Sequence, residues 1–360
     1  MRKTTTLRWF ACAIPVCALV LTGCGSQSSP GSTVKTDAGS AGDSGAISVA
    51  LLIPGTLGDL GFLDSSAEGL ERATSELGVE GKVIEGGANQ SAAWKSNLEN
   101  LSNGDYDLVV VGSALAADQL TEVAARHTEQ RYVSIDQEVD LENVASITFR
   151  QSDGAFLAGV AAALATTDQS AFPLSSGSKN VGFIGGSDIP VIRDFLAGFE
   201  GGAKAVDPAI TVQSSYVGNF TDAQTAYNQA TSMIAAGADA IFAAAGGGGL
   251  GALKAASEKG KYGIGVDSNQ NGLYPEAILA SDLKNSGNAL FAVISMLKDG
   301  TLETGKNYVF GISNGGVELI VNEDLVPEES VETINAFIEK VKDGEIEVPC
   351  VDPYCAPSGA

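Results

Sequence analysis

The chain of 360 residues is poor in histidine, cysteine and basic residues, and each shortage excludes a class of function. We expect three of the five cysteines to belong to an N-terminal export signal and its lipidation site, which leaves Cys350, Cys355 and the single histidine, His127; these are too few ligands for a usual zinc site, so we expect no metal. Lys and Arg number 21 against 44 Asp and Glu, which gives a formal charge of −23 at pH 7. Phosphate binding needs clustered basic residues, so we expect no nucleic acid partner.

Motifs of hydrolytic catalysis are also scarce. The sole histidine lies on a polar helix face, and an H-E-x-x-H pair is absent from the sequence. Two carboxylates can do acid–base chemistry, but nothing in the sequence marks a nucleophile. We therefore expect a binding protein without catalytic residues or cofactors. A nucleoside hydrolase or phosphorylase is the alternative enzyme hypothesis.

The N-terminus has the pattern of an export signal. Basic residues precede a mostly apolar stretch at 9–21, which is too short for a comfortable membrane span. The sequence "LTGC" that ends at Cys24 resembles a bacterial lipobox, in which the cysteine is lipidated. We expect a signal peptide at 1–23 and a lipid on Cys24 that anchors the chain to the outer face of the cell membrane. A cleaved signal without lipid is the alternative.

Residues 24–45, rich in Ser and Gly, predict a flexible tether.

Two cysteines remain near the C-terminus. Cys350 and Cys355 lie in the tail at 347–360. In an exported protein such a pair favours a disulfide, here a staple for the C-terminus, over two free thiols.

From residue 46 onward, short apolar runs alternate with longer amphipathic ones, which is typical of βαβ units and a parallel sheet. Strands are predicted at 47–54, 107–112, 131–136, 180–186, 239–246, 262–267 and 278–282. Helices are predicted at 65–77, 92–101, 117–127, 154–165, 191–205, 223–236 and 249–259.

These elements repeat along the chain. Asp107 matches Asp239 at an offset of 132 residues, and Asp136 matches Asp267 at 131. The repeat predicts an α/β protein with two similar doubly wound parallel-sheet lobes joined by a multi-strand hinge. We expect the first lobe at 46–150 and 276–305, and the second at 151–275 and 306–346. Crossings between the lobes are expected near 150–153, 269–275 and 305–311.

The paired aspartates suggest where a ligand binds. In open α/β sheets a ligand sits outside the carboxyl ends of the strands, and both Asp136 and Asp267 end strands. Two lobes that face each other across these ends form a cleft, and hinge closure around a ligand is the common motion. Alternatively, each aspartate only stabilises the turn that follows it.

Two loops carry further candidates. Asp59 can accept hydrogen bonds from a ligand, and Phe62 offers a flat apolar face, although this Phe can equally pack in the core. Phe220 takes the equivalent place in the second lobe, so two aromatic rings can sandwich a planar ligand. Trp94 is a third aromatic near the same rim or a core residue.

Two more candidates lie in the second half of the chain. Gly246 stands in a glycine run that lacks the Gly-Lys-Ser/Thr ending of a phosphate loop, so we expect it to let the backbone approach a ligand closely. Lys284 follows a predicted strand. It can pair with Asp267, reach ligand hydroxyls or lie in solvent.

Three stretches carry a family resemblance. They are "NVASITFRQSDGAFLAGVAAAL" (143–164), "NVGFIGGSDIPVIRDFLAGFEGGAKAVDP" (180–208) and "GADAIFAAAGGGGLGALKAASEKGKYGIGVDSNQ" (237–270). They resemble the basic membrane protein lipoproteins, type I periplasmic binding proteins that include purine nucleoside receptors of ABC transporters. The resemblance spans about 47–320.

The resemblance implies a monomeric receptor that binds a nucleoside between its lobes and passes it to a membrane permease. The family motif Asp-Asp-x-Ser-Phe-Asn appears here with Asp59 and Phe62 in place but with Leu63 instead of Asn. By the same resemblance, Asp136 ends a ligand-facing strand, Phe220 stacks on the base and Gly246 contacts the ligand. Asp267 and Lys284 match the pair that binds the ribose hydroxyls. Leu63 favours the alternatives of riboflavin or a nucleobase, and a sensor that signals to a membrane kinase is a further alternative.

Overall fold

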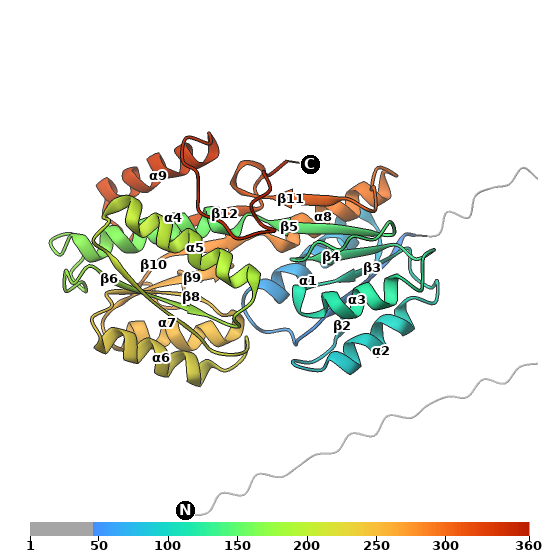
Figure 1. Ribbon diagram of the computed structural model, residues 1–360, viewed down its shortest axis with the longest axis horizontal. Coiled ribbons are helices and arrows are strands. Elements are labelled where there is room, and N and C mark those ends of the chain that lie inside the picture. The colour runs from blue at the N-terminus through green and yellow to red at the C-terminus, as the bar shows by residue number, and fades with distance from the viewer. Residues whose placement is uncertain (1–45, 360) are drawn as a thin grey trace, which may run out of the picture. The chain divides into compact units, whose positions relative to one another are not determined.

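Two six-stranded sheets organise residues 46–359, the part of the chain that the computed structural model describes. The first sheet has the strand order β11-β5-β4-β3-β1-β2, and the second β12-β10-β9-β8-β6-β7. All neighbours are parallel except β10 and β12. The expected α/β class with two parallel-sheet lobes is confirmed (Figure 1). The signal peptide, Cys24 and the tether lie outside the described residues.

The strands are β1 Ser48–Ile53, β2 Glu80–Glu85, β3 Leu108–Val111, β4 Tyr132–Ile135, β5 Val144–Phe149, β6 Asn180–Gly185, β7 Thr211–Tyr216, β8 Ala240–Ala244, β9 Tyr262–Asp267, β10 Ile278–Lys284, β11 Asn307–Phe310 and β12 Val317–Val321. The α-helices are α1 Phe62–Arg72, α2 Ser91–Leu101, α3 Ala117–Ala124, α4 Gln151–Thr167, α5 Pro190–Val206, α6 Ala223–Ala235, α7 Gly249–Glu258, α8 Ser286–Lys298 and α9 Glu328–Lys342. Among the described residues, none of the helices has the length and apolar character needed to cross a membrane.

Every predicted strand is present, but five strands were not predicted from the sequence: β2, β5, β7, β11 and β12. β2 and β7 lie at the sheet edges, where one side of the strand meets solvent and polar residues are tolerated. Their sequences, EGKVIE and TVQSSY, therefore lack the apolar run that marks the central strands.

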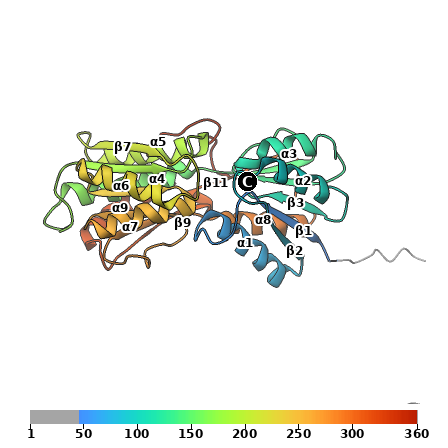
Figure 2. The same ribbon diagram turned by 90° about the horizontal axis from the view of Figure 1, so that it is seen from below.

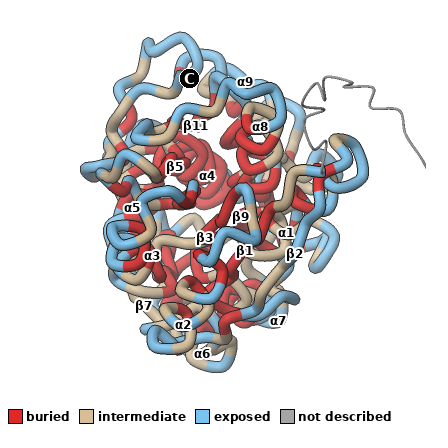
Figure 3. Tube along the Cα trace, turned by 90° about the vertical axis from the view of Figure 1, so that its right-hand side faces the viewer, coloured by how far each residue is buried: buried red, intermediate tan, exposed pale blue. Residues whose placement is uncertain are grey.

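Helices cover both faces of each sheet. In the first lobe, apolar residues of α1 and α8 pack on one face and those of α2 and α3 on the other. In the second lobe, α4, α5 and α9 cover one face and α6 and α7 the other (Figures 1 and 2). Figure 3 shows buried residues along the central strands and α4, with exposed segments on the outer helices and loops.

The helix α4 is buried almost all round, so its sequence QSDGAFLAGVAAALATT has no polar face. It packs closely against α5, and glycines of both helices lie where the two backbones meet. A Cβ on Gly202 of α5 would lie 1.8 Å from the Phe156 carbonyl oxygen of α4. The backbones approach so closely there that only glycine fits.

The chain crosses between the lobes three times within the region of the two sheets. The first crossing, between β5 and α4, is where the sequence places it. The second lies between β10 and α8, and the third between β11 and β12. The crossing expected at 269–275 is therefore wrong, because β10 pairs with β9 of the second sheet. The crossing expected near 305–311 lies a few residues later, at 311–316, because β11 still pairs with β5 of the first sheet. A short apolar strand does not reveal which of two similar sheets it joins.

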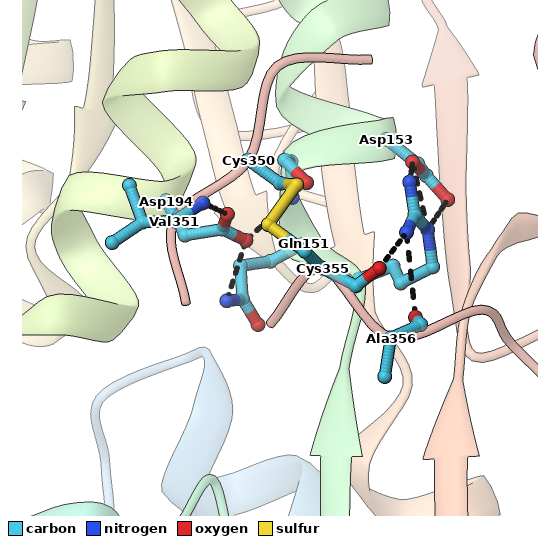
Figure 4. The surroundings of a disulfide bond; sticks show 9 residues. Gln151, Asp153, Asp194, Cys350, Val351, Cys355 and Ala356 are labelled. Carbon is cyan, nitrogen blue, oxygen red and sulfur yellow. Dashed lines mark hydrogen bonds and ion pairs between the residues drawn. A yellow bond between two sulfur atoms is a disulfide. The ribbon is translucent and has the colours of Figure 1, made fainter. Parts of the chain in front are cut away.

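The C-terminal pair forms a disulfide between Cys350 and Cys355, as expected, with Cα atoms 5.4 Å apart. The surrounding tail packs where the chain crosses between the lobes (Figure 4).

Candidate functional site

A cavity of about 330 Å³ lies between the lobes, at the carboxyl ends of the parallel strands. Loops after β1, β3 and β4 line it from the first lobe, and loops after β6, β7, β8 and β9, with the end of β10, from the second. This is the place where open α/β sheets bind ligands. Eight residues singled out from the sequence line it: Asp59, Phe62, Leu63, Asp136, Phe220, Gly246, Asp267 and Lys284.

The two repeated aspartates occupy equivalent positions with the same unusual backbone. Asp136 directly follows β4 with φ 73°, and Asp267 ends β9 with φ 67°. Left-handed conformations are uncommon outside glycine and cost on the order of 1–2 kcal/mol, although aspartate tolerates them better than most residues. Each lobe therefore has a buried aspartate in the left-handed conformation at the end of the equivalent strand.

Lys284 is buried, with 2% of its surface exposed, and pairs with Asp136 of the other lobe. Its Nζ lies 2.5 Å from Asp136 Oδ1, in ion-pair contact but without hydrogen-bond geometry. The rings of Phe62, Phe149 and Phe195 surround the ammonium at 4.9, 5.0 and 5.5 Å from their centroids. The expected pairing with Asp267 is thus replaced by a direct contact with Asp136, while Asp267 interacts with the lysine through charge alone.

Asp267 carries a strongly shifted acidity. Burial raises the pKa of its carboxyl to about 7, the nearby Asp59 and Asp136 add repulsion, and Lys284 opposes the shift. At neutral pH the group is therefore divided between its protonated and ionised forms. Its Oδ2 lies 3.4 Å from where a Cβ on Gly61 would be, an ordinary contact distance, so the loop before α1 lies beside this carboxyl.

One acidic residue behind the site was missed from the sequence. Asp282 lies two residues before Lys284 in β10, is 1% exposed, and has no hydrogen-bond partner for either carboxyl oxygen among the described residues. Burial raises its pKa well above the usual range, and Asp267 adds repulsion. The period of two along a strand places both side chains on the same face, a signal that the sequence does contain.

Another part of the cavity wall is apolar. Phe220 precedes α6, and its carbonyl oxygen accepts a hydrogen bond from the N–H of Gly248 at 2.9 Å. A Cβ on Gly186 would lie 2.3 Å from the Phe220 ring, so a glycine is needed to seat this ring. The side chain of Asp222 caps α6, since it accepts a hydrogen bond from the Thr225 N–H.

Sequence reasoning also missed part of this apolar wall. Ile189 and Ile192 flank the first turn of α5 and line the cavity, as do Leu57 and Leu115 from the first lobe. Leu57 and Leu115 are 41% and 37% exposed. Nothing in the isolated sequence distinguishes these aliphatic residues from those of the core.

Asp59 reaches the cavity, but the backbone uses most of its acceptors. Its carboxylate accepts hydrogen bonds from the N–H groups of Gly61, Leu63 and Asp64, at 3.0, 3.0 and 3.2 Å. Since a carboxylate offers about four acceptor positions, little remains for a ligand. The main role of Asp59 is therefore to hold the loop before α1. Burial raises its pKa, while these three N–H groups lower it.

Trp94 is a core residue, so its expected place at the ligand is wrong. Its side chain is 5% exposed within the first lobe, and it is not among the residues that line the cavity. The indole N–H donates to the Gly87 carbonyl at 2.7 Å, which satisfies the only polar atom of the ring.

The two lobes also contact each other through Ser268 and Gln270, which follow Asp267 in the chain. The Leu60 carbonyl of the first lobe accepts hydrogen bonds from Ser268 Oγ at 2.6 Å and Gln270 Nε2 at 3.1 Å. These contacts fix the glycine-rich loop before α1 against the loop after β9.

A serine motif known from hydrolases occurs where the chain passes from β11 to β12. Residues 311–315 read G-I-S-N-G, the spacing of a nucleophile elbow, which requires a turn from a strand into a helix. Here Ser313 lies in a short 3₁₀ turn between β11 and β12, and its hydroxyl contacts Ser358 at 2.7 Å. The segment is a crossing between lobes.

Comparisons with known proteins agree with this geometry. Residues 46–352 match a family described as "ABC transporter substrate-binding protein PnrA-like". Basic membrane protein A of Borreliella afzelii is 32% identical over 314 residues, which cover 85% of this chain and 93% of that protein. The CD4+ T-cell-stimulating antigen of Listeria monocytogenes serovar 1/2a is 30% identical over 316 residues, covering 82% and 85%.

A solved structure shows the same architecture. An ABC transporter solute-binding protein from Aeropyrum pernix K1 superposes with a TM-score of 0.74 at 27% identity, over 84% of this chain and 94% of that one. With a two-lobed fold, a cleft at the strand ends and a family match over nearly all described residues, the chain belongs to the PnrA-like substrate-binding proteins of ABC transporters, which bind solutes and are not enzymes.

Proposed function

We propose that this protein is a lipid-anchored receptor that binds a nucleoside between its lobes and delivers it to a membrane permease. The observation that carries the proposal is the mixed lining of the cavity. A buried cluster of Asp136, Asp267 and Lys284 supplies charged groups, with the Phe62 ring 4.9 Å from the Lys284 ammonium, and Phe220 adds a second aromatic ring to the aliphatic part of the wall. A molecule that joins a sugar to a flat ring matches this combination.

The polar cluster supplies both hydrogen-bonding roles that a ribose needs. An ionised carboxylate only accepts hydrogen bonds and an ammonium only donates them, whereas each hydroxyl does both. Asp267 accepts from two vicinal hydroxyls, and Lys284, held in place by Asp136, donates to one of them. Because these groups are buried before a ligand arrives, little ordering is needed on binding.

The apolar part of the cavity favours stacking on a flat ring over hydrogen bonding to the edge of a base. Phe220 offers an aromatic face, and base–aromatic stacking contributes about 1–3 kcal/mol per base for any base. Leu63 provides neither a donor nor an acceptor, whereas the family motif that this loop resembles has Asn at this position. We therefore propose that purine nucleosides bind with affinities within about tenfold of each other, which corresponds to about 1.4 kcal/mol.

A second candidate is a larger ring system with a polyhydroxylated chain, such as riboflavin. Three leucines in the cavity wall, Leu57, Leu63 and Leu115, favour it, because an extended apolar ring would cover them.

The test is calorimetric titration of the protein, after removal of bound ligand by unfolding and refolding, with adenosine, guanosine, inosine, cytidine and riboflavin. Micromolar or tighter binding of purine nucleosides supports the proposal. It also requires Asp267→Ala to weaken binding at least about tenfold, the effect of one lost buried hydrogen-bond partner. Asp140→Ala, which removes an exposed acidic residue, is the matched control and should bind as the unaltered protein does. The nucleoside proposal would be refuted if none of the four nucleosides bound.

The anchor and the delivery step are tested separately. Cells fed labelled palmitate should label the protein, and Cys24→Ala should abolish the label. Nucleoside uptake that persists in a strain without this gene would argue against a delivery role.

A further inference from the structure

We propose that the disulfide-closed C-terminal tail is a fourth connection between the lobes, and that Tyr354 in it positions the ligand-facing Asp136. The inference rests on the proposed ligand site only for its effect on affinity. The connection itself stands on contacts that do not involve a ligand.

The tail starts on the second lobe. Val348 is buried in the core formed with α4, α5 and α9. The N–H of Val351 donates to Oδ1 of Asp194 in α5 at 2.7 Å. Oδ2 of the same carboxyl accepts from Gln151 Nε2 at 2.7 Å, at the start of α4 (Figure 4). The first part of the tail is thus tied to α5 and to the start of α4, the helix that follows the first crossing.

The tail then reaches the first lobe. Arg150, which joins β5 to α4, donates from Nη1 to the carbonyl oxygens of Cys355 and Ala356, at 3.1 and 3.3 Å. The N–H of Gly359 donates to the Val309 carbonyl of β11 at 3.3 Å. Residues 348–359 therefore bridge the lobes alongside the three crossings of the main chain.

Tyr354 lies inside the loop closed by Cys350 and Cys355 and is 2% exposed. Its hydroxyl donates to the backbone carbonyl of Asp136 at 2.8 Å. This carbonyl belongs to the residue with φ 73° that pairs with Lys284.

Each polar group of Asp136 is therefore held by a different part of the chain. Its N–H donates to the Ile147 carbonyl at 2.8 Å within the first sheet. Its carboxylate contacts Lys284 of the second sheet, and its carbonyl is held by Tyr354 of the tail. A residue in a left-handed conformation persists only where its surroundings fix it, so loss of the Tyr354 contact lets the backbone relax and moves the carboxylate.

The test compares Tyr354→Phe with Tyr308→Phe. Both substitutions remove one buried tyrosine hydroxyl and keep the ring. Tyr308 is 8% exposed in the first lobe, and within residues 46–359 its hydroxyl bonds only to the backbone of Glu303, away from the cavity. It therefore controls for the loss of a tyrosine hydrogen bond in itself.

Two measurements are made on the full chain of each variant. Hydrogen–deuterium exchange of the ligand-free protein reports on the amides of 135–138, and calorimetry reports the Kd for inosine. In Tyr354→Phe we expect exchange at 135–138 to accelerate and the Kd to rise, each about three- to tenfold. In Tyr308→Phe we expect both to stay as in the unaltered protein.

The proposal is overturned if Tyr354→Phe leaves the exchange at 135–138 unchanged, if it leaves the Kd unchanged, or if Tyr308→Phe produces the same changes. A purely structural tyrosine would lower the melting temperature without altering the Kd of the folded protein. If the unaltered protein binds none of the four nucleosides, the proposed function fails by itself, and the exchange measurement alone decides whether the tail positions Asp136.

Discussion

Replacing Asp267 by asparagine should make the ligand-free protein more stable while damaging its binding site. The carboxyl is 9% exposed, and its pKa is raised to about 7 from an ordinary value of 3.8. Asparagine keeps the shape of the side chain and cannot ionise. The substitution therefore removes the free-energy cost of a buried negative charge beside Asp59 and Asp136.

The sign and size follow from proton linkage. Between about pH 4 and 7 the folded protein keeps a proton on Asp267 that the unfolded chain has lost, so this residue lowers stability as pH rises through that interval. One pKa unit corresponds to about 1.4 kcal/mol, so the cost is about 2 kcal/mol at pH 5 and about 4 kcal/mol at pH 8. Asp267→Asn should gain these amounts.

The assay is urea unfolding of both proteins at pH 5 and pH 8, followed by circular dichroism. Asp140→Asn removes an exposed charge and should change stability by no more than about 0.5 kcal/mol at either pH. A loss of stability in Asp267→Asn at pH 8, or a gain that does not grow from pH 5 to pH 8, would refute the reasoning.

Three further predictions follow from the same geometry. Nucleoside affinity should rise about tenfold from pH 6 to pH 8 as Asp267 ionises, and calorimetry at both pH values should show no such rise in Asp267→Asn. Lys284→Met should lower the free energy of unfolding by about 3–5 kcal/mol in urea, because it leaves the carboxylate of Asp136 buried without its partner; an unchanged midpoint would contradict this. Gly202→Ala should cost at least about 1–3 kcal/mol in thermal unfolding, because its Cβ would lie 1.8 Å from a carbonyl oxygen of α4, whereas Gly272→Ala, with nothing within 4 Å, should be nearly neutral.

The repeated pattern in the sequence predicted most of the fold and the centre of the site. A strand that ends in aspartate, found twice at an offset of 131 residues, placed Asp136 and Asp267 correctly at the cavity. This works because strand period and strand ends are local properties, and because parallel strands all point their carboxyl ends to the same edge.

Partners across the cleft could not be predicted in this way. The contact of Lys284 with Asp136 joins residues of different sheets, and it depends on the angle between the lobes. For Trp94 the error came from reading an aromatic at a helix start as exposed, whereas its ring lies in the core of the first lobe. The assignment of β10 and β11 to sheets failed because both strands are apolar enough to pair in either lobe.

The role of the tail was equally hidden. The sequence predicted a disulfide between Cys350 and Cys355 but gave no reason to connect it with the ligand site. Only the three-dimensional path of the tail brings Tyr354 to the backbone of Asp136.

The central claim is that Asp267 and its neighbours hold the vicinal hydroxyls of a ribose, and it is tested most directly by a matched pair of ligands. Calorimetry should show that adenosine binds at least about tenfold more tightly than 2′-deoxyadenosine, since the missing hydroxyl leaves a buried acceptor unpaired. In Asp267→Ala the two affinities should become equal, because the group that distinguishes them is gone. Equal affinities in the unaltered protein, or no binding of either ligand, would contradict the account.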